Sequence, residues 1–353
     1  LGMVHILGVG SIGTFLAYHL KHSIPQCPVT LLLRNAAAQN QWLQEARQSI
    51  VVQPSCVHQA SLPGITPQAP GNPVSPIKTL IITTKAHQTL DAFQCVAHRL
   101  QPSSVIVLLQ NGMGVQQELE SFLKQTLPYI NGYPSLHCYP SFVVGTVTHG
   151  CYRTAPFQVK HAGKGIIWLG SNQATHPSVQ SVFQMFESVL PLQCQIETWP
   201  QIQHRLLLKV AVNACINPLT ALHSCTNGEL LCDNQPSLRL LIKQLCKETS
   251  LILTEHLRGI PTLSRPSSPL QLDKSNDHFS TNQLAEFSPN ALEAQVTHVC
   301  QITASNISSM RQDVIAHRPT EINYINGYIV QLANQLNLPC ETHQSMVQQI
   351  HSL

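Results

Sequence analysis

Short apolar runs alternate with helical patterns along the first half of the chain. Four of these runs have the length and the β-branched content of buried strands, and each ends at a turn signal: VHILGVG, VTLLLRN, TLIITTK and SVIVLLQNG. Strands that alternate with helices predict a doubly wound parallel sheet. The later runs SFVVGTVTHGCY, FQVKHAG and GIIWLGS contain more glycine, and they predict a more antiparallel edge of the same sheet.

The second half of the chain has helical periodicity instead. Apolar residues recur there at three- and four-residue spacing, which predicts helices over 201–222, 236–257, 291–312 and 320–335. The change of pattern lies near residues 196–200. We therefore expect an α/β domain over residues 1–198 and an all-α domain over residues 199–353.

Two stretches interrupt this plan, residues 54–77 and 260–290. Both mix turn formers with polar residues, and the first is rich in proline. Such composition predicts surface loops.

One predicted helix carries polar residues in an apolar setting. In KVAVNACINPLTAL, residues 209–222, the polar residues Lys209, Asn213 and Asn217 recur every four positions and therefore share one face. This pattern alone leaves two interpretations open. Either the lysine stem covers apolar neighbours while the asparagines bond to the backbone, or the polar face lines a binding site.

The sequence GVGSIG follows the first predicted strand and precedes the helical pattern TFLAYHL. Its glycines, Gly8, Gly10 and Gly13, have the spacing of a dinucleotide-binding turn, where they permit a tight turn, close approach to a pyrophosphate and close helix packing. The amino terminus of the next helix then faces the phosphates. Glycine-rich turns also occur for structural reasons, but the strand, turn and helix in this order favour cofactor binding.

Polar residues follow three further predicted strands. Arg34 stands where an NAD-binding chain usually has a carboxylate for the ribose hydroxyl, and a guanidinium there favours the 2′-phosphate of NADP. An exposed arginine at a strand end is the alternative. Lys85 either adds charge to the phosphate site or is solvated. Asn111, in QNGMG, either bonds a ligand at the carboxyl edge of the sheet or serves an ordinary Asn-Gly turn.

Composition narrows the classes of function. Only 10% of the 353 residues are charged, and Lys plus Arg (20) barely exceed Asp plus Glu (17), so the chain lacks the basic field that nucleic-acid binding requires. The 12 cysteines form no C-x-x-C pair and no zinc-finger spacing, which predicts mostly reduced, buried thiols and no metal site. Because no apolar run approaches the ~18 residues of a membrane span and no signal peptide is recognisable, we expect no membrane interaction and a cytoplasmic location.

Several motifs, in their order along the chain, resemble the ketopantoate reductase (2-dehydropantoate 2-reductase) family: GVGSIG, TTKAHQT, QNGMG, KVAVNACINPLTAL, NGEL, NISSMRQD and RPTEINYINGY. The most selective parts of this resemblance are residues 209–222 and 318–328. It implies a Rossmann-type domain followed by a helical domain. It also implies the NADPH-dependent reduction of 2-dehydropantoate, a small 2-keto acid, to (R)-pantoate on the route to pantothenate and coenzyme A. Both a monomer and a homodimer are compatible with the sequence.

The resemblance also assigns roles to matching positions. The implied pyrophosphate turn comprises Gly8, Gly10 and Gly13, and the implied contacts to the 2′-phosphate end of NADPH are Arg34, Lys85 and Gln88. The implied catalytic residues are Lys209 and Glu321. The implied substrate-binding residues are Asn111, Asn213, Asn217, Asn227, Asn306 and Ser309, of which Asn111 also lies beside the nicotinamide.

The chemistry of ketone reduction supports the assignment of Lys209. Hydride attack builds negative charge on the carbonyl oxygen, and an ammonium supplies both a proton and a positive charge. Burial lowers the pKa of such a lysine, whereas a nearby carboxylate such as Glu321 opposes that shift. Glu321 has an alternative role as a helix-start residue, since Pro319 and Thr320 precede it. Ser309 either bonds the substrate carboxylate or is a polar residue on an exposed helix face.

Two other functions remain compatible with the sequence. A related reductase would keep Lys209 and Glu321 and accept another 2-keto acid. A non-catalytic NADP(H)-binding sensor would need the glycine turn but no proton donor, so the joint presence of Lys209, Asn213, Asn217 and Glu321 argues against it.

Overall fold

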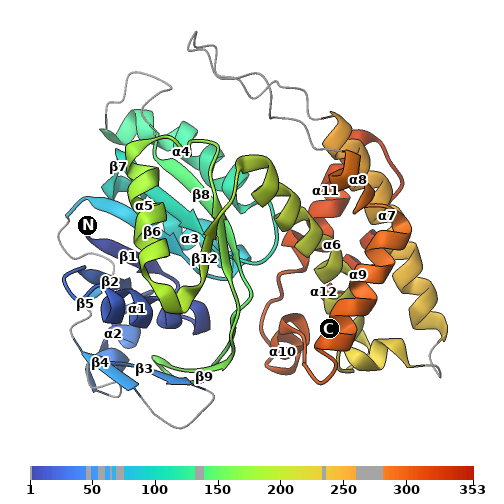
Figure 1. The fold of residues 1–353 in the computed structure, drawn as a ribbon, viewed down its shortest axis with the longest axis horizontal. Coiled ribbons are helices and arrows are strands. Elements are labelled where there is room, and N and C mark those ends of the chain that lie inside the picture. Colours follow the sequence, from blue (N-terminus) through green and yellow to red (C-terminus); the bar gives the residue numbers. More distant parts are fainter. Residues whose placement is uncertain are drawn as a thin grey trace. The chain divides into compact units, whose positions relative to one another are not determined.

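The computed structural model describes residues 2–44, 49–54, 60–63, 66–68, 75–131, 139–232, 236–259 and 281–353. The chain divides into two units (Figure 1). The first comprises Leu1–Gln110 and Val115–Ile202, and the second comprises Asn111–Gly114 and Gln203–Leu353. Helix α6 (Trp199–Leu222) begins in the first unit and continues through the second.

The first unit contains an eight-stranded sheet with the order β12-β11-β8-β7-β6-β1-β2-β5. Its neighbouring strands are parallel except for β8 and β11. The strands are β1 (Val4–Leu7), β2 (Val29–Leu32), β5 (Thr66–Gln68), β6 (Ile77–Ile82), β7 (Leu100–Leu108), β8 (Ser141–Val147), β11 (Ile167–Gly170) and β12 (Cys194–Ile196). The predicted α/β fold with a mostly parallel sheet is confirmed.

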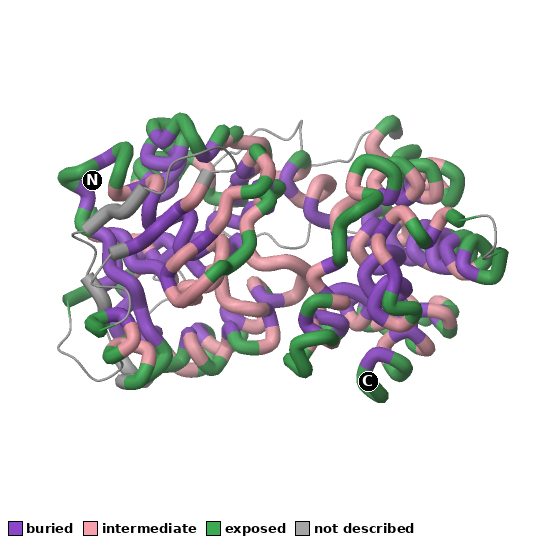
Figure 2. The backbone as a smooth tube through the Cα atoms, turned by 90° about the horizontal axis from the view of Figure 1, so that it is seen from below, coloured by how far each residue is buried: buried purple, intermediate pink, exposed green. Residues whose placement is uncertain are grey.

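Helices connect these strands, and burial explains why the strands are nearly continuous apolar runs. Every residue of β1 and β2 is buried, as expected for strands whose two faces are both covered. Figure 2 shows the buried stretches along the strands of this unit and along the helices of the second unit. The longer helices of the first unit are α1 (Ser11–Ser23), α2 (Ala36–Gln44), α3 (Ala86–Gln94), α4 (Val115–Asn131) and α5 (Pro177–Ser188).

A second, four-stranded sheet in the first unit differs from the sequence expectation. Its order is β4-β3-β10-β9. The antiparallel edge that we predicted for the main sheet is correct for β11, but β8 lies parallel to β7, and β9 and β10 belong to the smaller sheet. Strand β10 pairs in parallel with β3, so that Val159 lies opposite Val52, a long-range pairing that no local pattern reveals. The strands are β3 (Ser49–Pro54), β4 (Ala60–Pro63), β9 (Gly150–Ala155) and β10 (Gln158–Gly163).

Parts of the two predicted loops are regular structure. Within 54–77, β4 and β5 are strands, and β5 is the edge of the main sheet beside β2. An edge strand tolerates Pro67, whose missing N–H would break an inner ladder. Within 260–290, helix α8 (Thr281–Ala285) forms and α9 begins at Pro289. Residues 55–59, 64–65, 69–74 and 260–280 of these stretches lie outside the described residues.

The described part of the second unit is helical. Two predicted helices are divided: the 291–312 pattern forms α9 (Pro289–Ile302) and α10 (Ser309–Ile315), and the 320–335 pattern forms the short helix η4 (Ile322–Tyr324) and α11 (Asn326–Leu336). The longer helices besides α6 and α8 are α7 (Pro236–Gly259), α9 (Pro289–Ile302), α10 (Ser309–Ile315), α11 (Asn326–Leu336) and α12 (Glu341–His351). The short helices are η3 (Gly228–Leu231) and η4 (Ile322–Tyr324).

Helix α6 is long and apolar enough, by length and composition, to cross a bilayer, and it is the one described helix with this property. This qualifies the expectation that no run approaches such a length. However, 67% of its most apolar window is buried inside the structure, as in the core helix of a globular unit. The described cysteines are all free, and most of them are buried, including Cys215 on this helix.

A histidine cluster packs around Phe15 of α1. The Phe15 ring lies 4.5 Å from that of His19, 4.9 Å from His149 and 4.8 Å from His161, measured between centroids. His149 Nδ1 and His161 Nε2 are 3.1 Å apart, whereas neither ring nitrogen of His19 has a hydrogen-bond partner among the described residues. Burial, and the neighbouring histidines, lower the pKa of His19 to about 4.

This cluster predicts a loss of stability in mild acid. The unfolded chain binds a proton at His19 below its ordinary pKa of 6.5, whereas the folded chain resists protonation down to about 4, so folding stability decreases as the pH falls between these values. His19→Leu should reduce the stability difference between pH 7 and pH 5 by about 2 kcal/mol, measured by urea unfolding. His98→Leu, at an exposed histidine, serves as the control. An unchanged difference in His19→Leu would contradict the prediction.

Candidate functional site

The glycine turn joins β1 to α1, and two of its glycines are required by the turn itself. Gly8 has φ +100°, and a Cβ there would overlap the backbone of Thr83 and Thr84. Thr83 Oγ1 donates a hydrogen bond of 2.5 Å to the Gly8 carbonyl oxygen. A Cβ on Gly13 would overlap that same carbonyl oxygen. These glycines therefore let α1 pack closely against the end of β1.

Gly10 has a different environment. A Cβ at this position would meet no atom of the described residues within 4 Å, so this part of the fold does not require glycine there. Among the described residues, no side chain caps the amino terminus of α1, and its first turn carries no acidic residue. Open space in front of an uncapped, positively polarised helix end suits a pyrophosphate group.

The strand order brings cationic residues to this turn. Strand β1 lies between β6 and β2, so the residues that follow these strands, Gly8, Lys85 and Arg34, come to the same edge of the sheet. Arg34 and Gln88 are exposed, and Lys85 is half-buried at the N-cap of α3.

A second guanidinium lies near Arg34. Burial, and then the charge of Arg34, lower the pKa of Arg153 on β9. The sequence did not single out Arg153 because β9 reaches this position through the smaller sheet, whose long-range pairing was not predicted. Two positive charges near the end of β2 form an environment suited to a phosphate.

The Asn111 turn belongs to the second unit. The Met113 N–H donates to the Tyr324 carbonyl oxygen at 2.8 Å, and a Cβ on Gly112 would lie 2.6 Å from that oxygen. Gly112 has φ +83°, but Asn111 is not among the residues with positive φ. The turn therefore does not use the tolerance of asparagine for this conformation, and it places Asn111 close to the segment that follows Glu321.

The polar face of α6 carries the predicted catalytic lysine. Lys209 and Asn213 are half-buried, and Asn217 is buried. Burial lowers the pKa of Lys209 to about 8, while the negative charge of Glu321 opposes this shift. Glu321 is itself only 4% exposed. Lys209 and Glu321 are therefore brought together as opposite charges in a largely apolar environment.

Glu321 stands at the start of a helix, as its alternative role expects. Glu321 occupies the N-cap position of η4, but its side chain makes no capping hydrogen bond. The charge of the carboxylate also acts on Lys209.

Ser308, which was not selected from the sequence, has the structural role of capping α10, so Ser309 does not have this role. The side chain of Ser308 accepts a hydrogen bond of 3.1 Å from the Arg311 N–H and so caps α10. Its Oγ also lies 2.7 Å from Thr220 Oγ1 of α6. Ser309 is half-buried, directly after this cap. Ser308 rather than Ser309 therefore caps α10, and its contact with Thr220 holds α10 beside the carboxyl-terminal part of α6.

Asn227 and Asn306 are brought together, but their environments differ. The Asn227 N–H donates to the Asn306 carbonyl oxygen at 3.1 Å, and Asn227 Nδ2 donates to Thr303 Oγ1 at 2.8 Å. Asn227 is buried, whereas Asn306 is exposed. These bonds give Asn227 a structural role in fastening η3 to the connection between α9 and α10.

Family models cover both units. The model described as "Ketopantoate reductase PanE/ApbA" matches residues 4–174, and the model described as "Ketopantoate reductase PanE/ApbA C terminal" matches residues 201–353. A protein of Schizosaccharomyces pombe named probable 2-dehydropantoate 2-reductase is 30% identical over 98% of this chain and 94% of its own length. The chain belongs to the ketopantoate reductase family.

Other ketopantoate reductase relatives agree. The 2-dehydropantoate 2-reductase of Vibrio cholerae is 31% identical over 78% of this chain and 77% of its own length. The crystal structure of a probable 2-dehydropantoate 2-reductase from Bacillus subtilis is 26% identical, has a TM-score of 0.68, and covers 100% of this chain and 99% of its own. A D-mandelate dehydrogenase solved with NADH and anilino(oxo)acetate has a TM-score of 0.74 over 100% of this chain and 98% of its own, but its 17% identity shows a shared fold alone.

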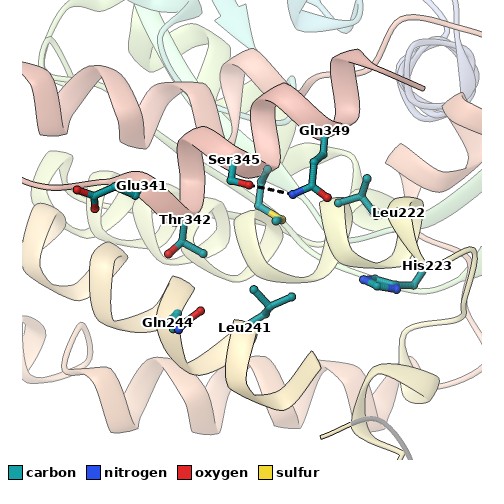
Figure 3. Close-up of a pocket in the computed structure, with 9 residues that line it drawn as sticks. Leu222, His223, Leu241, Gln244, Glu341, Thr342, Ser345 and Gln349 are labelled. Carbon is teal, nitrogen blue, oxygen red and sulfur yellow. Dashed lines mark hydrogen bonds between the residues drawn. The ribbon is translucent and has the colours of Figure 1, made fainter. Parts of the chain in front are cut away.

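This ketopantoate reductase family member has a cavity of about 430 Å³ among helices of the second unit (Figure 3). It is lined by the end of α6, including Leu222, by Leu241 and Gln244 of α7, and by residues of α12. Gln349 donates to Ser345 Oγ at 2.9 Å along one side. Lys209, Asn213 and Asn217 are not among its lining residues, and Leu222 is roughly 20 Å along α6 from Lys209 at the helical rise.

The different environments of Gly13 and Gly10 predict different effects of substitution on stability. Gly13→Ala should lower the thermal unfolding midpoint, because the new Cβ must displace the Gly8 carbonyl, at a cost of about 1–3 kcal/mol. Gly10→Ala should leave the midpoint unchanged, because its Cβ enters open space. Differential scanning fluorimetry of both full-length variants compares them directly. Equal destabilisation by the two substitutions would contradict the geometry.

Proposed function

We propose that this protein reduces 2-dehydropantoate to (R)-pantoate with NADPH, a step on the route to pantothenate and coenzyme A. The observation that carries the proposal is the Lys209 ammonium, whose pKa is lowered to about 8 beside Glu321, in a chain of the ketopantoate reductase family. The relatives named 2-dehydropantoate 2-reductase match this chain across both units.

The first unit fits a dinucleotide. The open space at Gly10 and the uncapped start of α1 would hold the pyrophosphate. Arg34 and Arg153 would bind the adenosine 2′-phosphate, with Lys85 and Gln88 at the end of β6, and this supports NADPH over NADH. The bound cofactor supplies the hydride.

Lys209 would act as the general acid. A lysine with a pKa of about 8 is mostly protonated at pH 7, yet it releases its proton more readily than an ordinary lysine. As the carbonyl oxygen gains negative charge, the ammonium stabilises it and transfers a proton from Nζ to it. Glu321 holds the ammonium in place and would also accept a hydrogen bond from the substrate hydroxyl.

The remaining polar groups would bind and orient the keto acid. Asn213 and Asn217, one and two helical turns beyond Lys209, would bond the substrate without adding charge, and Ser309 would bond its carboxylate. Asn111 would lie beside the nicotinamide and the substrate, and Asn306 would complete the set, held in position by Asn227.

A second candidate is a related reductase of another 2-keto acid. The fold shared with a protein named D-mandelate dehydrogenase keeps this alternative open, because one fold can serve reductases of different small carboxylic acids. A non-catalytic sensor is disfavoured, because binding a dinucleotide requires neither a buried ammonium nor its carboxylate partner. The cytoplasmic location and the assembly as a monomer or homodimer stay predictions, although one structural neighbour, from Staphylococcus aureus, is described as a dimeric ketopantoate reductase.

Turnover and its pH dependence test the function. Purified protein should oxidise NADPH with 2-dehydropantoate faster than with other 2-keto acids, followed by the absorbance of NADPH. The rate of reduction should decrease above about pH 8, because deprotonated Lys209 cannot donate a proton.

Variants assign the proton donor in the same assay. Lys209→Ala should lower kcat by about 10²–10⁴ and leave NADPH binding intact, whereas Lys247→Ala, at an exposed lysine, should have no effect. Full turnover in Lys209→Ala would overturn the role of Lys209. The absence of turnover with every keto acid, despite tight NADPH binding, would favour the sensor.

The preference for NADPH depends on the two arginines. Arg34→Ala should weaken NADPH binding about tenfold or more and change NADH binding little, because only NADPH has the 2′-phosphate. Arg153→Ala should have a smaller effect in the same direction. Fluorescence titration of both cofactors, with Arg258→Ala as an exposed control, measures this. Equal loss of both cofactors in Arg34→Ala would contradict the assignment.

A further inference from the structure

A proline removes one backbone hydrogen bond of α6, at a carbonyl that lies between Asn213 and Asn217. In an α-helix, the carbonyl of residue i accepts from the N–H of residue i+4, and proline has no N–H. Pro218 lies inside α6, so the carbonyl of Ala214, four residues earlier, has no helical donor. Ala214 is fully buried, which also removes solvent as a partner. Such a buried acceptor requires another donor.

The donor is a side chain from another helix. Asn326, the first residue of α11, is fully buried, and its Nδ2 donates to the Ala214 carbonyl oxygen at 2.9 Å. The asparagine amide therefore takes the place of the backbone N–H that Pro218 lacks.

A histidine of α12 fixes the orientation of this amide. His343 Nδ1 lies 3.1 Å from Asn326 Nδ2, and because Nδ2 is a donor, Nδ1 must accept. The ring proton then lies on Nε2, which is 2.9 Å from Thr249 Oγ1 and 3.3 Å from the Leu245 carbonyl oxygen on α7. Burial lowers the pKa of His343 to about 4 and keeps the ring neutral, although the carboxylate of Glu248 opposes this shift.

Glu248 completes the chain of contacts. Its carboxylate accepts hydrogen bonds from the Thr342 N–H at 2.9 Å and from the His343 N–H at 3.1 Å. It thereby fixes the start of α12 against α7. Both hydrogens of the Asn326 amide are used, one on α6 and one on a histidine that is itself held on two sides.

We propose that Asn326 is a positioning residue for the catalytic helix. Ala214 lies between Asn213 and Asn217, and Asn326 follows Glu321 by five residues, so this one bond ties the substrate-binding face of α6 to the segment that carries the catalytic carboxylate. Asn326 fixes the distance between Lys209 and Glu321 and does not itself contact the reacting atoms. This inference rests on the proposed reductase function for its effect on kcat. The replacement of the missing Pro218 N–H by the Asn326 amide does not depend on that function.

A double-mutant cycle in the full-length protein tests the proposal. Asn326→Leu removes the donor and should lower both kcat, by about tenfold to a hundredfold, and the thermal unfolding midpoint, with NADPH affinity unchanged. Pro218→Ala supplies a backbone N–H to Ala214, so the same Asn326→Leu change should cost less in that background. The loss of the His343 contact is common to both backgrounds and cancels. Asn334→Ala, exposed on the same helix, is the matched control.

The outcomes are distinct. A smaller loss of midpoint and of kcat in the Pro218→Ala background supports the proposal, and equal losses in both backgrounds, or an unchanged kcat in Asn326→Leu, would overturn it. If Asn326→Leu fails to fold in one background, Asn326→Ser, whose shorter hydroxyl does not reach Ala214, replaces it in the same cycle. If the native protein reduces no 2-keto acid, the proposed function fails, while the cycle in unfolding midpoint still decides the pairing.

Discussion

The structure of the second unit depends on one electrostatic constraint, a lysine ammonium placed on an apolar helix. Such a charge is tolerated only with a partner, and Glu321 supplies it from a different element. Because the partner comes from outside α6, the segment around η4 must be held firmly against this helix. The bonds from Met113 to Tyr324 and from Asn326 to Ala214 fasten both sides of that segment. Much of the polar network described above can be understood as a means of keeping two charges at a fixed separation.

In the first unit, the charges near the glycine turn have a different environment. Its cationic residues near the glycine turn are mostly exposed, and the backbone rather than a buried charge shapes the turn. Position comes from strand order: with β1 between β6 and β2, residues far apart in sequence share one edge of the sheet. Exposed charges keep most of their hydration and need no partner within the protein, whereas the charges of Lys209 and Glu321 in the second unit offset each other.

The sequence predicted those features that have a local periodic signal. Strands β1 and β2 are buried on both faces and therefore read as apolar runs, and the four-residue spacing from Lys209 to Asn217 located the polar face of α6. Features that depend on distant partners were missed. The pairing of β3 with β10, the position of Arg153 beside Arg34, and the capping by Ser308 that splits one predicted helix follow from tertiary contacts. The role of Asn326 could likewise not be predicted, because its amide donates to a carbonyl that Pro218, more than 100 residues earlier, leaves without its helical donor.

The smaller sheet has a consequence for how the chain folds. Its two antiparallel pairs, β3 with β4 and β9 with β10, are local, but the parallel ladder that joins them sets Val52 opposite Val159. During synthesis, the β3 edge emerges about a hundred residues before its permanent neighbour, and it must remain soluble over that interval. An unpaired strand edge is a template for association with other chains. The long-range pairing, more than the final stability, therefore sets how long this strand edge stays unpaired during folding.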